Sequence, residues 1–438
     1  MKVCVVGLWH LGTVTAACLA AGGHTVAGLD FDSSTIESLQ TGLPPLFEPG
    51  LEELVKRGLS EGTLSFTTDV AQATREAELI WVAYDTPVDE EDQADVGFVL
   101  ERVTKLFPHT SAGTLILISS QLPVGTTRRL EQMYASAYPQ KKISFAYSPE
   151  NLRLGKAIEV FTEPDRVVVG LRDSKDSSAA ADRERIAELF GPFTAAIEWM
   201  SVESAEMTKH ALNAFLATSV TFINEVAALC EQVGADAKEV ERGLKTEARI
   251  GPKAYLGAGA AFAGGTLARD VAFLEQVGAA KNQPTHLLSA VRASNDNHRK
   301  WIHRKLEMLL GELRNRTIAV WGLTYKPGTS TLRRSSSVEL CEWLHDEGAR
   351  VQAHDPAIQA LPDNLAQKIV LCETPVAALE DAVALVLATG WPDYKALAAE
   401  AILSAMREPV VVDPNRFLES TLGNDPRVRY TAVGRGRL

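Results

Sequence analysis

Short apolar runs alternate with amphipathic stretches over the first two hundred residues of the chain. The runs predict buried strands at Lys2–Val6, Thr25–Leu29, Leu79–Ala83, Thr114–Ser119 and Arg166–Gly170. A helix is predicted after the first strand, over Leu11–Ala21. Strands separated by helical stretches are typical of βαβ units, so we expect a mostly parallel sheet.

The periodicity becomes helical near residue 200. The segment from Val202 to about Val233 is predicted to be one long helix, because apolar residues recur close to helical spacing at Met207, Ala211, Phe215, Val220, Ile223, Ala227 and Cys230. More helix is predicted as far as about Arg304. A long helix in a mid-chain helical domain often carries a subunit interface, so we expect a homodimer or higher homo-oligomer.

Strand character returns in the last third of the chain. Strands are predicted at Thr317–Val320, Ala349–Ala353, Val383–Ala388 and Pro409–Val412, with a helix at Val338–Asp346. The predicted fold class is therefore α/β: two Rossmann-like doubly wound parallel-sheet domains joined by a central helical domain. The predicted boundaries are 1–199, 200–310 and 311–438, because the polar stretch Gly311–Arg316 precedes the last group of strands.

Composition narrows the class of protein. The chain has 438 residues, 46% hydrophobic and 23% charged, which excludes disorder and collagen-like repeats. The formal net charge of −12 argues against nucleic acid or an anionic membrane as a partner. Val3–Gly23 lacks charged residues, but His10 and several glycines interrupt it. A buried strand, turn and helix explain that segment better than a signal peptide or membrane span.

Cysteine and histidine usage indicates compartment and metal content. The five cysteines are scattered and form no C-x-x-C pair, which argues against a disulfide framework and fits a reducing, cytoplasmic location. The nine histidines show no H-E-x-x-H or similar spacing, so we expect no metal site.

The first candidate site is the sequence GLWHLG, on a predicted strand-to-helix turn. Dinucleotide sites carry G-x-G-x-x-G there, and Gly7 and Gly12 match the outer glycines, whereas Trp9 takes the middle position. Asp30 ends the second strand, where a carboxylate binds ribose hydroxyls and favours NAD over NADP. The alternative is a Rossmann-like turn that binds another ligand or none.

Further turns follow later strands, where the carboxyl ends of parallel strands line a ligand crevice. They are Thr86-Pro87 and the segment Ser119–Thr127, although plain turn chemistry explains their Pro and Gly equally well. We assign to the cofactor Gly7, Trp9, His10, Leu11, Gly12, Asp30, Thr86, Pro87, Ser120 and Thr126.

Candidate catalytic residues occur on the long helix and in three loops. Glu206, Lys209 and Asn213 share one helical face, where they either act chemically or form a solvated stripe. The first loop contains Glu150 and Arg153, and the second contains a glycine pair followed by Thr266 and Asp270. The third loop contains Lys326, Arg333 and Arg334. A glycine loop with converging cations suits a pyrophosphate, and a surface basic cluster is the alternative for the last loop.

In this order and at these separations, the motifs resemble the UDP-glucose/GDP-mannose dehydrogenase family from Lys2 to about Phe417. The supporting matches are EPGL at 48–51, PVGTT at 123–127, PDRVVVG at 164–170, RIG at 249–251 and YKPGT at 325–329. The resemblance implies an N-terminal NAD domain, a helical dimerisation domain and a C-terminal domain for the nucleotide diphosphate. The family oxidises the C6 alcohol of a nucleotide sugar to a carboxylate in two hydride transfers to NAD.

The resemblance also implies roles for individual residues. Lys209 and Asn213 match the residues that stabilise oxyanions and hold the catalytic water, Asp270 matches the Asp that assists that water, and Glu150 matches the Glu of the later hydrolytic step. Arg249 matches a substrate-binding Arg that often reaches across the dimer. The residues assigned to the substrate are Leu152, Arg153, Arg249, Phe262, Gly264, Gly265, Lys326 and Arg333.

One departure from the family pattern bears on the chemistry. The family's nucleophilic Cys is replaced here by Thr266, and the Lys before the Asp by Arg269. A thiol has a pKa of about 8.5 and ionises readily, whereas a hydroxyl is far less acidic, so a thioester cannot form at this position. Asn151, Leu154, Glu247 and Trp9 also differ from the family pattern.

Three functions stay open. The first is an NAD-dependent nucleotide-sugar oxidoreductase that stops after one hydride transfer. The second is a four-electron dehydrogenase that oxidises a hydrated aldehyde, with Glu150 and Asp270 as bases. The third is a catalytically silent protein that still binds the nucleotide sugar.

Overall fold

The computed structural model describes residues 1–87, 94–172, 177–263 and 265–436. The chain divides into two compact units, Met1–Ala211 and Leu212–Leu438, called unit 1 and unit 2. The helix α9 (Val202–Val233) is continuous through the boundary, with the bounds predicted from its periodicity.

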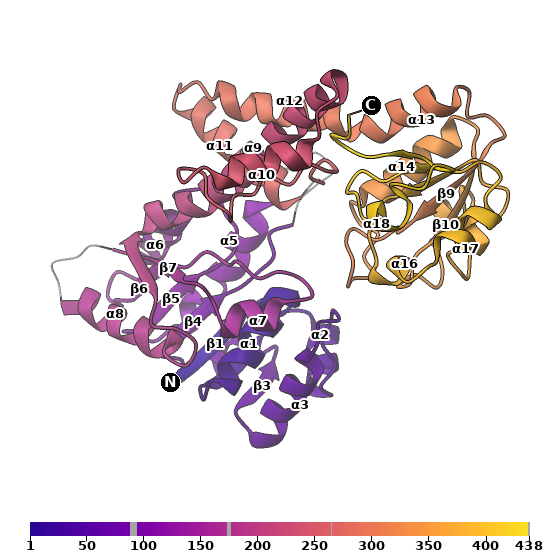
Figure 1. The fold of residues 1–438 in the computed structure, drawn as a ribbon. Helices are drawn as coiled ribbons and strands as arrows, with labels where there is room; N and C mark the ends of the chain where they lie inside the picture. The colour runs from indigo at the N-terminus through magenta and orange to yellow at the C-terminus, as the bar shows by residue number, and fades with distance from the viewer. Residues whose placement is uncertain (88–93, 173–176, 264, 437–438) are drawn as a thin grey trace. The chain divides into compact units, whose positions relative to one another are not determined.

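Unit 1 is built on an eight-stranded sheet of order β3-β2-β1-β4-β5-β6-β7-β8 (Figure 1). The strands are β1 (Lys2–Val6), β2 (Thr25–Leu29), β3 (Leu64–Thr67), β4 (Leu79–Val82), β5 (Leu115–Ile118), β6 (Ser144–Tyr147), β7 (Val167–Leu171) and β8 (Ile197–Ser201). Neighbouring strands run parallel except β6 and β7, which confirms the prediction of a mostly parallel sheet.

Helices cover both faces of this sheet. They are α1 (His10–Ala21), α2 (Ser33–Gln40), α3 (Leu51–Glu61), α4 (Val70–Thr74), α5 (Val96–Thr104), α6 (Thr126–Ala137), α7 (Ala157–Thr162) and α8 (Ser177–Phe190), with a 3₁₀ turn at Phe107–His109. Alternate strand residues enter two cores, because successive side chains of a strand point to opposite faces. Val3 and Val5 pack in the core with α1, whereas Cys4 and Val6 pack in the core with α5.

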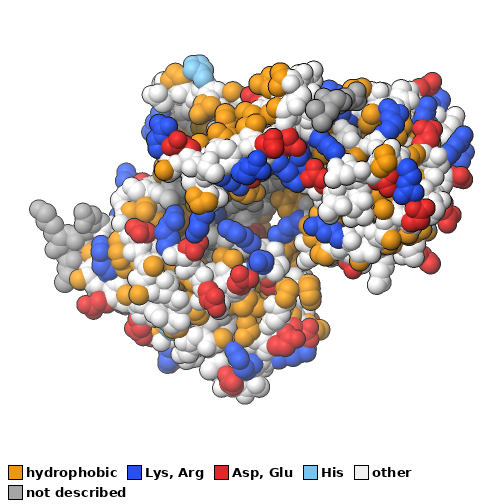
Figure 2. All heavy atoms as spheres, viewed as in Figure 1, with side chains coloured by type: hydrophobic (Ala, Val, Ile, Leu, Met, Phe, Trp, Pro, Cys, Tyr) orange, Lys and Arg blue, Asp and Glu red, His pale blue; other side chains and the backbone are white. Residues whose placement is uncertain are grey.

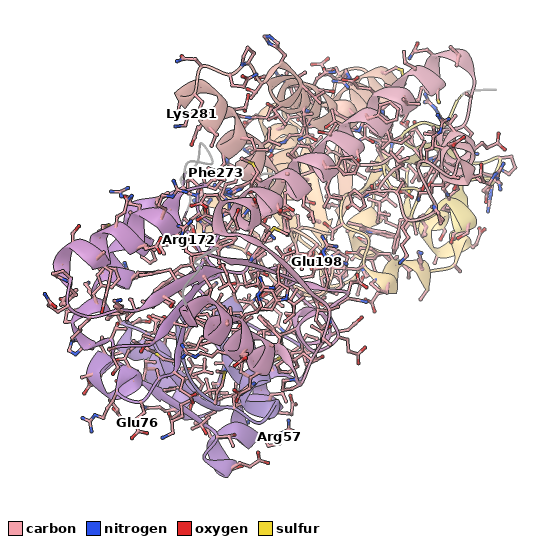
Figure 3. All side chains as sticks on the ribbon, turned by 90° about the vertical axis from the view of Figure 1, so that its left-hand side faces the viewer. Arg57, Glu76, Arg172, Glu198, Phe273 and Lys281 are labelled. Atoms are coloured by element: carbon pink, nitrogen blue, oxygen red, sulfur yellow. The ribbon has the colours of Figure 1, made fainter. Side chains whose placement is uncertain are left out.

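An arginine secures the end of β7 to two helices. The Arg172 side chain, labelled in Figure 3, forms ion pairs with Glu131 on α6 at 2.9 Å and with Glu203 at the start of α9 at 2.6 Å. All three side chains are partly shielded from solvent, so the pairs are screened less than fully exposed ones. They fix the start of α9 against the sheet of unit 1.

Unit 2 contains an all-parallel six-stranded sheet of order β11-β10-β9-β12-β13-β14. The strands are β9 (Thr317–Trp321), β10 (Arg350–His354), β11 (Ile369–Leu371), β12 (Ala384–Leu387), β13 (Val410–Val412) and β14 (Arg429–Thr431). In each sheet the first strand in the chain lies between the second and the fourth, which is the doubly wound arrangement.

The helices of unit 2 divide between a helical part and the second sheet. The helical part has the end of α9 with α10 (Ala237–Thr246), α11 (Thr266–Ala280), α12 (His286–Arg299) and α13 (Trp301–Leu310). Around the sheet lie α14 (Ser336–Asp346), α15 (Asp363–Ala366), η2 (Ala377–Leu379), α16 (Pro392–Lys395), α17 (Ala399–Ala405) and α18 (Glu419–Leu422). A small apolar cluster of Ala214, Ala217, Val271 and Val291 joins α9, α11 and α12.

The predicted fold class is confirmed: two parallel-sheet α/β parts with helices between them along the chain. The predicted strands occur within one or two residues of their expected bounds, whereas β3, β6, β8, β11 and β14 were not predicted. By length and composition alone α9 is apolar enough to cross a bilayer. Half of its most apolar window is buried inside the protein.

His303 on α13 gives unit 2 a pH-dependent contact. Its ring stacks on Trp343 of α14 with centroids 4.0 Å apart, and burial, together with Lys300, Arg304 and Arg299, lowers its pKa to about 4. The folded state therefore binds fewer protons than the unfolded state between about pH 4 and the usual histidine pKa of about 6.5. Stability rises with pH wherever the unfolded state binds more protons, so acidification through this window destabilises the unit.

We predict that the midpoint temperature of thermal unfolding decreases as the pH is lowered from 6.5 to 4.5. In His303→Phe this temperature should decrease less steeply. The variant keeps an aromatic ring against Trp343 but removes the titrating group. Thermal unfolding followed by circular dichroism at several pH values measures both slopes. Burial also lowers the pKa of His298 and His354, so part of the slope must remain. Identical slopes for variant and parent would contradict the assignment.

Candidate active site

The turn after β1 has the geometry of a dinucleotide cradle. Gly7 has φ +91°, and a Cβ there would lie 2.6 Å from the Tyr84 ring. A Cβ on Gly12 would lie 1.7 Å from the Gly7 carbonyl oxygen, so α1 approaches the turn too closely for any side chain. Trp9 has an ordinary φ of −71°, precedes the first residue of α1 and leaves its indole 51% exposed. The backbone therefore accepts Trp9 where the motif has glycine.

Asp30 lies at the end of β2 beside this turn. Its Oδ2 accepts the Leu8 N–H at 2.7 Å and its Oδ1 accepts the Asp32 N–H at 3.1 Å. The carboxylate is half-buried, so lone pairs stay accessible for ribose hydroxyl groups. Next in the chain, Asp32 caps α2 by accepting the N–H groups of Ser34 and Thr35, and these bonds lower its pKa.

The loops after β4 and β5 complete the carboxyl edge of the sheet. The Thr86 hydroxyl donates to the Gln121 carbonyl at 2.8 Å, which ties these two loops together. The Thr126 hydroxyl donates to the Pro123 carbonyl at 2.6 Å, so it closes the turn into α6. Ser120 is buried, and among the described residues its Oγ has no hydrogen-bond partner.

The remaining predicted cofactor residues differ in accessibility. Leu11 is half-buried in the first turn of α1, and Pro87 is exposed. His10 is buried and contacts Glu48. The close approach allowed by Gly7 and Gly12, the accessible carboxylate of Asp30 and the buried hydroxyl of Ser120 together fit NAD.

Lys209 and Glu206 on α9 are buried, so the alternative of a solvated stripe is wrong for this face. Lys209 is 8% exposed, and its ammonium donates to the Glu150 carbonyl and to Asn151 Oδ1 at 3.3 Å. Glu206 accepts the N–H groups of Gly125 at 2.6 Å and Thr127 at 3.0 Å, so it caps α6. Lys209 is therefore held by a loop, whereas Glu206 caps a helix.

The loop that holds Lys209 precedes α7. Glu150 is half-buried, and its carboxylate accepts the Leu152 N–H. Arg153 is exposed, and its carbonyl accepts the Lys156 N–H at 2.8 Å. The structure thus brings Glu150 and Lys209 together, whereas the Arg153 side chain faces solvent.

In unit 2, Asn213 and Asp270 form a buried pair. The Asn213 side-chain amide donates to Asp270 Oδ2, and the two residues are 5% and 0% exposed. Asp270 lies one turn into α11, and Thr266 is the first residue of that helix. The preceding Gly265 has φ +108° and provides no side-chain cap, and Thr266 is exposed. Gly264 lies outside the described residues.

The structure describes all five cysteines. None of them lies in α11, the helix that Thr266 begins, or close to Thr266 in the chain. Cys4 lies in β1 and Cys18 in α1, and burial raises the pKa of each thiol to about 12. Burial likewise raises the pKa of Cys341 in α14 and of Cys372 after β11. Cys230 is buried in α9. None of these thiols lies in α11.

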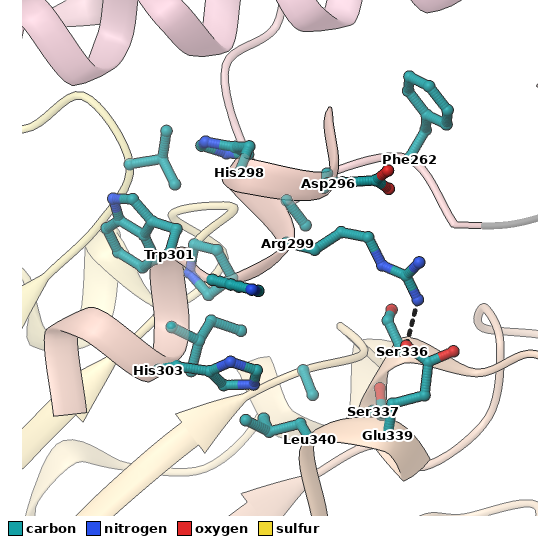
Figure 4. Close-up of a pocket in the computed structure, with 17 residues that line it drawn as sticks. Phe262, Asp296, His298, Arg299, Trp301, His303, Ser336, Ser337, Glu339 and Leu340 are labelled. Carbon is teal, nitrogen blue, oxygen red and sulfur yellow. Dashed lines mark hydrogen bonds and ion pairs between the residues drawn. The ribbon is translucent and has the colours of Figure 1, made fainter. Parts of the chain in front are cut away.

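A cavity of about 450 Å³ lies at the carboxyl ends of β12 and β13 in unit 2 (Figure 4). Its polar lining includes Asp296 and Arg299 from α12, His303 from α13, and Ser336 and Glu339 from α14. Arg299 forms an ion pair with Glu339 across it, drawn as a dashed line in Figure 4. The N-terminus of α14 opens here, which favours an anionic ligand such as a phosphate.

Of the predicted substrate residues that the structure describes, one lines this cavity. It is Phe262, whose N–H and carbonyl bond the Asn295 side chain of α12 at 3.1 and 2.9 Å. Lys326 and Arg333 lie on the loop before α14 but do not line the cavity, and Arg249 is 88% exposed and paired with Glu247. Arg299 and Glu339 were missed because they carry no motif and meet only through the packing of α12 on α14.

The turn after β9 has the same glycine and carboxylate arrangement as the turn after β1, but its carboxylate is not accessible to a ligand. Gly322 has φ +87°, and Asp355 Oδ2 accepts the Leu323 N–H at 2.7 Å. The same carboxylate also accepts from the N–H and hydroxyl of Thr324 and from the Trp391 and Ala357 N–H groups, and Asp355 is 3% exposed. It has no accessible oxygen for ribose, so the second turn does not repeat the cofactor site.

Comparisons with known proteins match the chain along its length. Sequence profiles of the UDP-glucose/GDP-mannose dehydrogenase family match its NAD binding domain at residues 1–194, its central domain at 203–297 and its UDP binding domain at 319–420. The UDP-glucose 6-dehydrogenase of Pseudomonas aeruginosa is 34% identical, covering 100% of this chain and 98% of that protein. UDP-glucose 6-dehydrogenase TuaD of Bacillus subtilis is 35% identical, with 99% and 93% covered.

A solved structure agrees with these relatives. A UDP-glucose dehydrogenase from Pyrobaculum islandicum superposes with a TM-score of 0.85 at 33% identity, covering 94% of this chain and 93% of that chain. The cofactor is NAD, and the substrate is a nucleotide sugar.

We predict that Asp30→Asn weakens NAD binding about tenfold to a hundredfold, because a hydrogen bond to a charged group is worth about 1.5–3 kcal/mol. The thermal midpoint should change little, since an Asn oxygen still accepts the Leu8 N–H. Asp355→Asn is the matched control: it should lower the thermal midpoint of unit 2 and leave NAD affinity unchanged. Titration calorimetry and thermal unfolding separate the two effects, and equal NAD affinities for Asp30→Asn and the parent would refute the assignment.

Proposed function

Because the chain belongs to the UDP-glucose/GDP-mannose dehydrogenase family, we propose that it is an NAD-dependent nucleotide-sugar oxidoreductase that performs one alcohol–carbonyl interconversion and forms no thioester. The observation that carries the proposal is the lack of a usable thiol. Thr266 begins α11, and burial shields Cys4, Cys18, Cys230 and Cys341. A covalent second oxidation needs a thiolate that attacks the aldehyde, and a threonine hydroxyl ionises too weakly to replace it.

The proposed chemistry uses residues that do not depend on a thiol. When bound, NAD accepts the hydride from the reacting carbon of the sugar. Lys209 stabilises the developing alkoxide with its ammonium, which the loop at Glu150 and Asn151 holds in one position. The proton of the alcohol hydroxyl would leave through a water held by the Asn213 and Asp270 pair. One alcohol and one NAD give one carbonyl, one NADH and one proton.

A second candidate is a full UDP-sugar 6-dehydrogenase, as the names of the relatives from P. aeruginosa and B. subtilis suggest for this chain. A hydrated aldehyde then donates the second hydride, and Glu150 or Asp270 takes a proton from the gem-diol. Both carboxylates are held by hydrogen bonds beside oxyanion-stabilising groups, Lys209 and Asn213, which supports this route.

We predict one NADH per sugar consumed and a carbonyl product when the protein is given NAD and a panel of UDP-, GDP- and dTDP-sugars. Thr266→Ala should keep the first hydride transfer within about threefold, because Thr266 does not take part in it. Thr266→Cys should raise the yield towards two NADH with an acid product, since a thiol at the start of a helix ionises readily. Absorbance at the NADH band and product mass measure both quantities.

Cys372→Ser is the control, because Cys372 is the cysteine that is not fully buried; it should leave the yield unchanged. Two NADH from both the parent and Thr266→Ala would replace the proposal with the hydrated-aldehyde route. UDP binding without NADH from any sugar would identify a silent nucleotide-sugar-binding protein.

We further propose that the protein is a cytoplasmic homodimer joined through α9. Phe215, Phe222 and Leu229 recur every seven residues and are 69%, 49% and 66% exposed. Their spacing keeps them on one helix face, which is the pattern of a helix that packs against a second helix. Hydrophobic side chains also gather over the helical part of unit 2 in Figure 2. The side chain of Arg249 is 88% exposed, as expected of a residue that reaches into a partner's site.

We predict that Phe215→Glu combined with Leu229→Glu halves the mass measured by light scattering after gel filtration. The two carboxylates would be buried against the partner without counter-ions, which is strongly unfavourable. Val370→Glu is the control, because Val370 is 62% exposed but lies on β11. A parent protein that is already monomeric at micromolar concentration would exclude the dimer.

A further inference from the structure

Glu48 is a buried carboxylate that joins segments far apart in the sequence. It is 4% exposed and lies just before α3. Its Oε2 accepts from His10 Nε2 at 2.9 Å and from the Gly155 N–H at 2.7 Å. Its Oε1 accepts the Ala157 N–H at 2.7 Å. Three donors thus satisfy a charge that would otherwise be costly to bury.

One of these donors belongs to the cofactor cradle. His10 is the first residue of α1 and directly follows Trp9, so it lies inside the turn that Gly7 and Gly12 shape. His10 is 6% exposed, and its Nε2 lies 2.9 Å from Glu48 Oε2. The pair therefore connects the cradle directly to Glu48.

The other two donors belong to the loop that holds Lys209. Gly155 and Ala157 end the segment whose Glu150 carbonyl and Asn151 side chain accept the Lys209 ammonium. Ala157 is the first residue of α7, and the helix has no side-chain cap of its own at Lys156. Glu48 provides that cap from a distance of more than a hundred residues along the chain.

We propose that Glu48 and His10 are positioning residues through which NAD in the cradle orders the Lys209-holding loop. A dinucleotide that packs against the first turn of α1 restricts His10. The restriction passes through one buried hydrogen bond to Glu48 and from there to the backbone at 155 and 157. Glu48, His10 and Ala157 are buried and Gly155 is half-buried, so breaking these bonds leaves poorly solvated polar groups, and the segments favour a joint arrangement.

The reciprocal effect follows from linkage. If bound NAD favours the ordered loop by a given free energy, then ordering the loop favours NAD binding by the same free energy. The alternative is that Glu48 only caps α7, in which case its removal destabilises the helix but leaves the loop insensitive to NAD.

Hydrogen exchange measured by mass spectrometry distinguishes these possibilities on the full-length protein, without need of activity. In the parent, saturating NAD should slow exchange of the backbone amides of residues 150–157 severalfold. In His10→Leu at saturating NAD this slowing should largely disappear, and His10→Gln should restore part of it because the amide can still donate to Glu48. Glu48→Gln should behave like His10→Leu, because an amide cannot accept from all three donors.

The double variant tests that the two residues act through one contact. Loss of NAD affinity in His10→Leu combined with Glu48→Gln should be no greater than in the worse single variant. His24→Leu is the matched control: His24 is 4% exposed and bonds the Leu189 carbonyl at 3.0 Å, away from this loop. It should lower the thermal midpoint and keep the NAD response. Full slowing in His10→Leu, or none in the parent, overturns the proposal.

Discussion

Both sheets depend on the same interaction, a carboxylate that accepts the backbone N–H just after a left-handed glycine. Asp30 accepts from Leu8 and Asp355 accepts from Leu323, each at 2.7 Å. The glycines Gly7 and Gly322 have φ of +91° and +87°, which turns the chain sharply from strand to helix or loop. The turn points an N–H inward, and a buried N–H must be paired. The carboxylate pairs it and so joins the ends of two neighbouring strands.

The two turns differ in the further hydrogen bonds that the carboxylate accepts. These bonds decide whether the carboxylate stays accessible to a ligand. Asp30 accepts from backbone only and keeps an accessible edge, so its turn can bind a ribose. Asp355 is enclosed by Thr324, Trp391 and Ala357, so its turn is structural. The cavity of unit 2 lies instead at the ends of β12 and β13 and beside the N-terminus of α14. A glycine turn paired with a carboxylate thus suits ribose binding in unit 1, whereas in unit 2 the same kind of turn is closed by its own hydrogen bonds.

Much of the fold could be predicted because its main elements have clean periodicities. β1 and α9 have the predicted bounds, since a continuous apolar run and a long helical period are strong signals. β8 was missed because its pattern IEWMS is only partly buried and alternates weakly. β11 and β14 are three residues long, which is too short for any period to appear.

The candidate site could be predicted where its residues belong to local motifs. Lys209, Asn213 and Asp270 are buried and hydrogen-bonded, and their roles stay predictions. The sequence did not reveal that Glu206 caps α6, because Gly125 lies far from it in the chain. It also did not reveal the pairing of His10 with Glu48 or of Arg299 with Glu339. Such partners are chosen by the packing of separate elements, which no single-segment pattern contains.

In the proposed reaction, a hydroxyl rather than a thiol at the start of α11 bears on the second oxidation and not on the first. Hydride removal needs an ammonium near the alkoxide and a route for one proton, and we propose Lys209 and the Asn213 and Asp270 pair for these two roles. Acyl transfer needs an anionic nucleophile. The positive end of a helix lowers a thiol pKa by a few units, enough to ionise a group that begins near 8.5. The same field cannot ionise a hydroxyl, whose pKa begins far higher. Under this proposal Thr266 separates the two oxidations chemically, and an aldehyde would have to leave or hydrate before a second hydride could be removed.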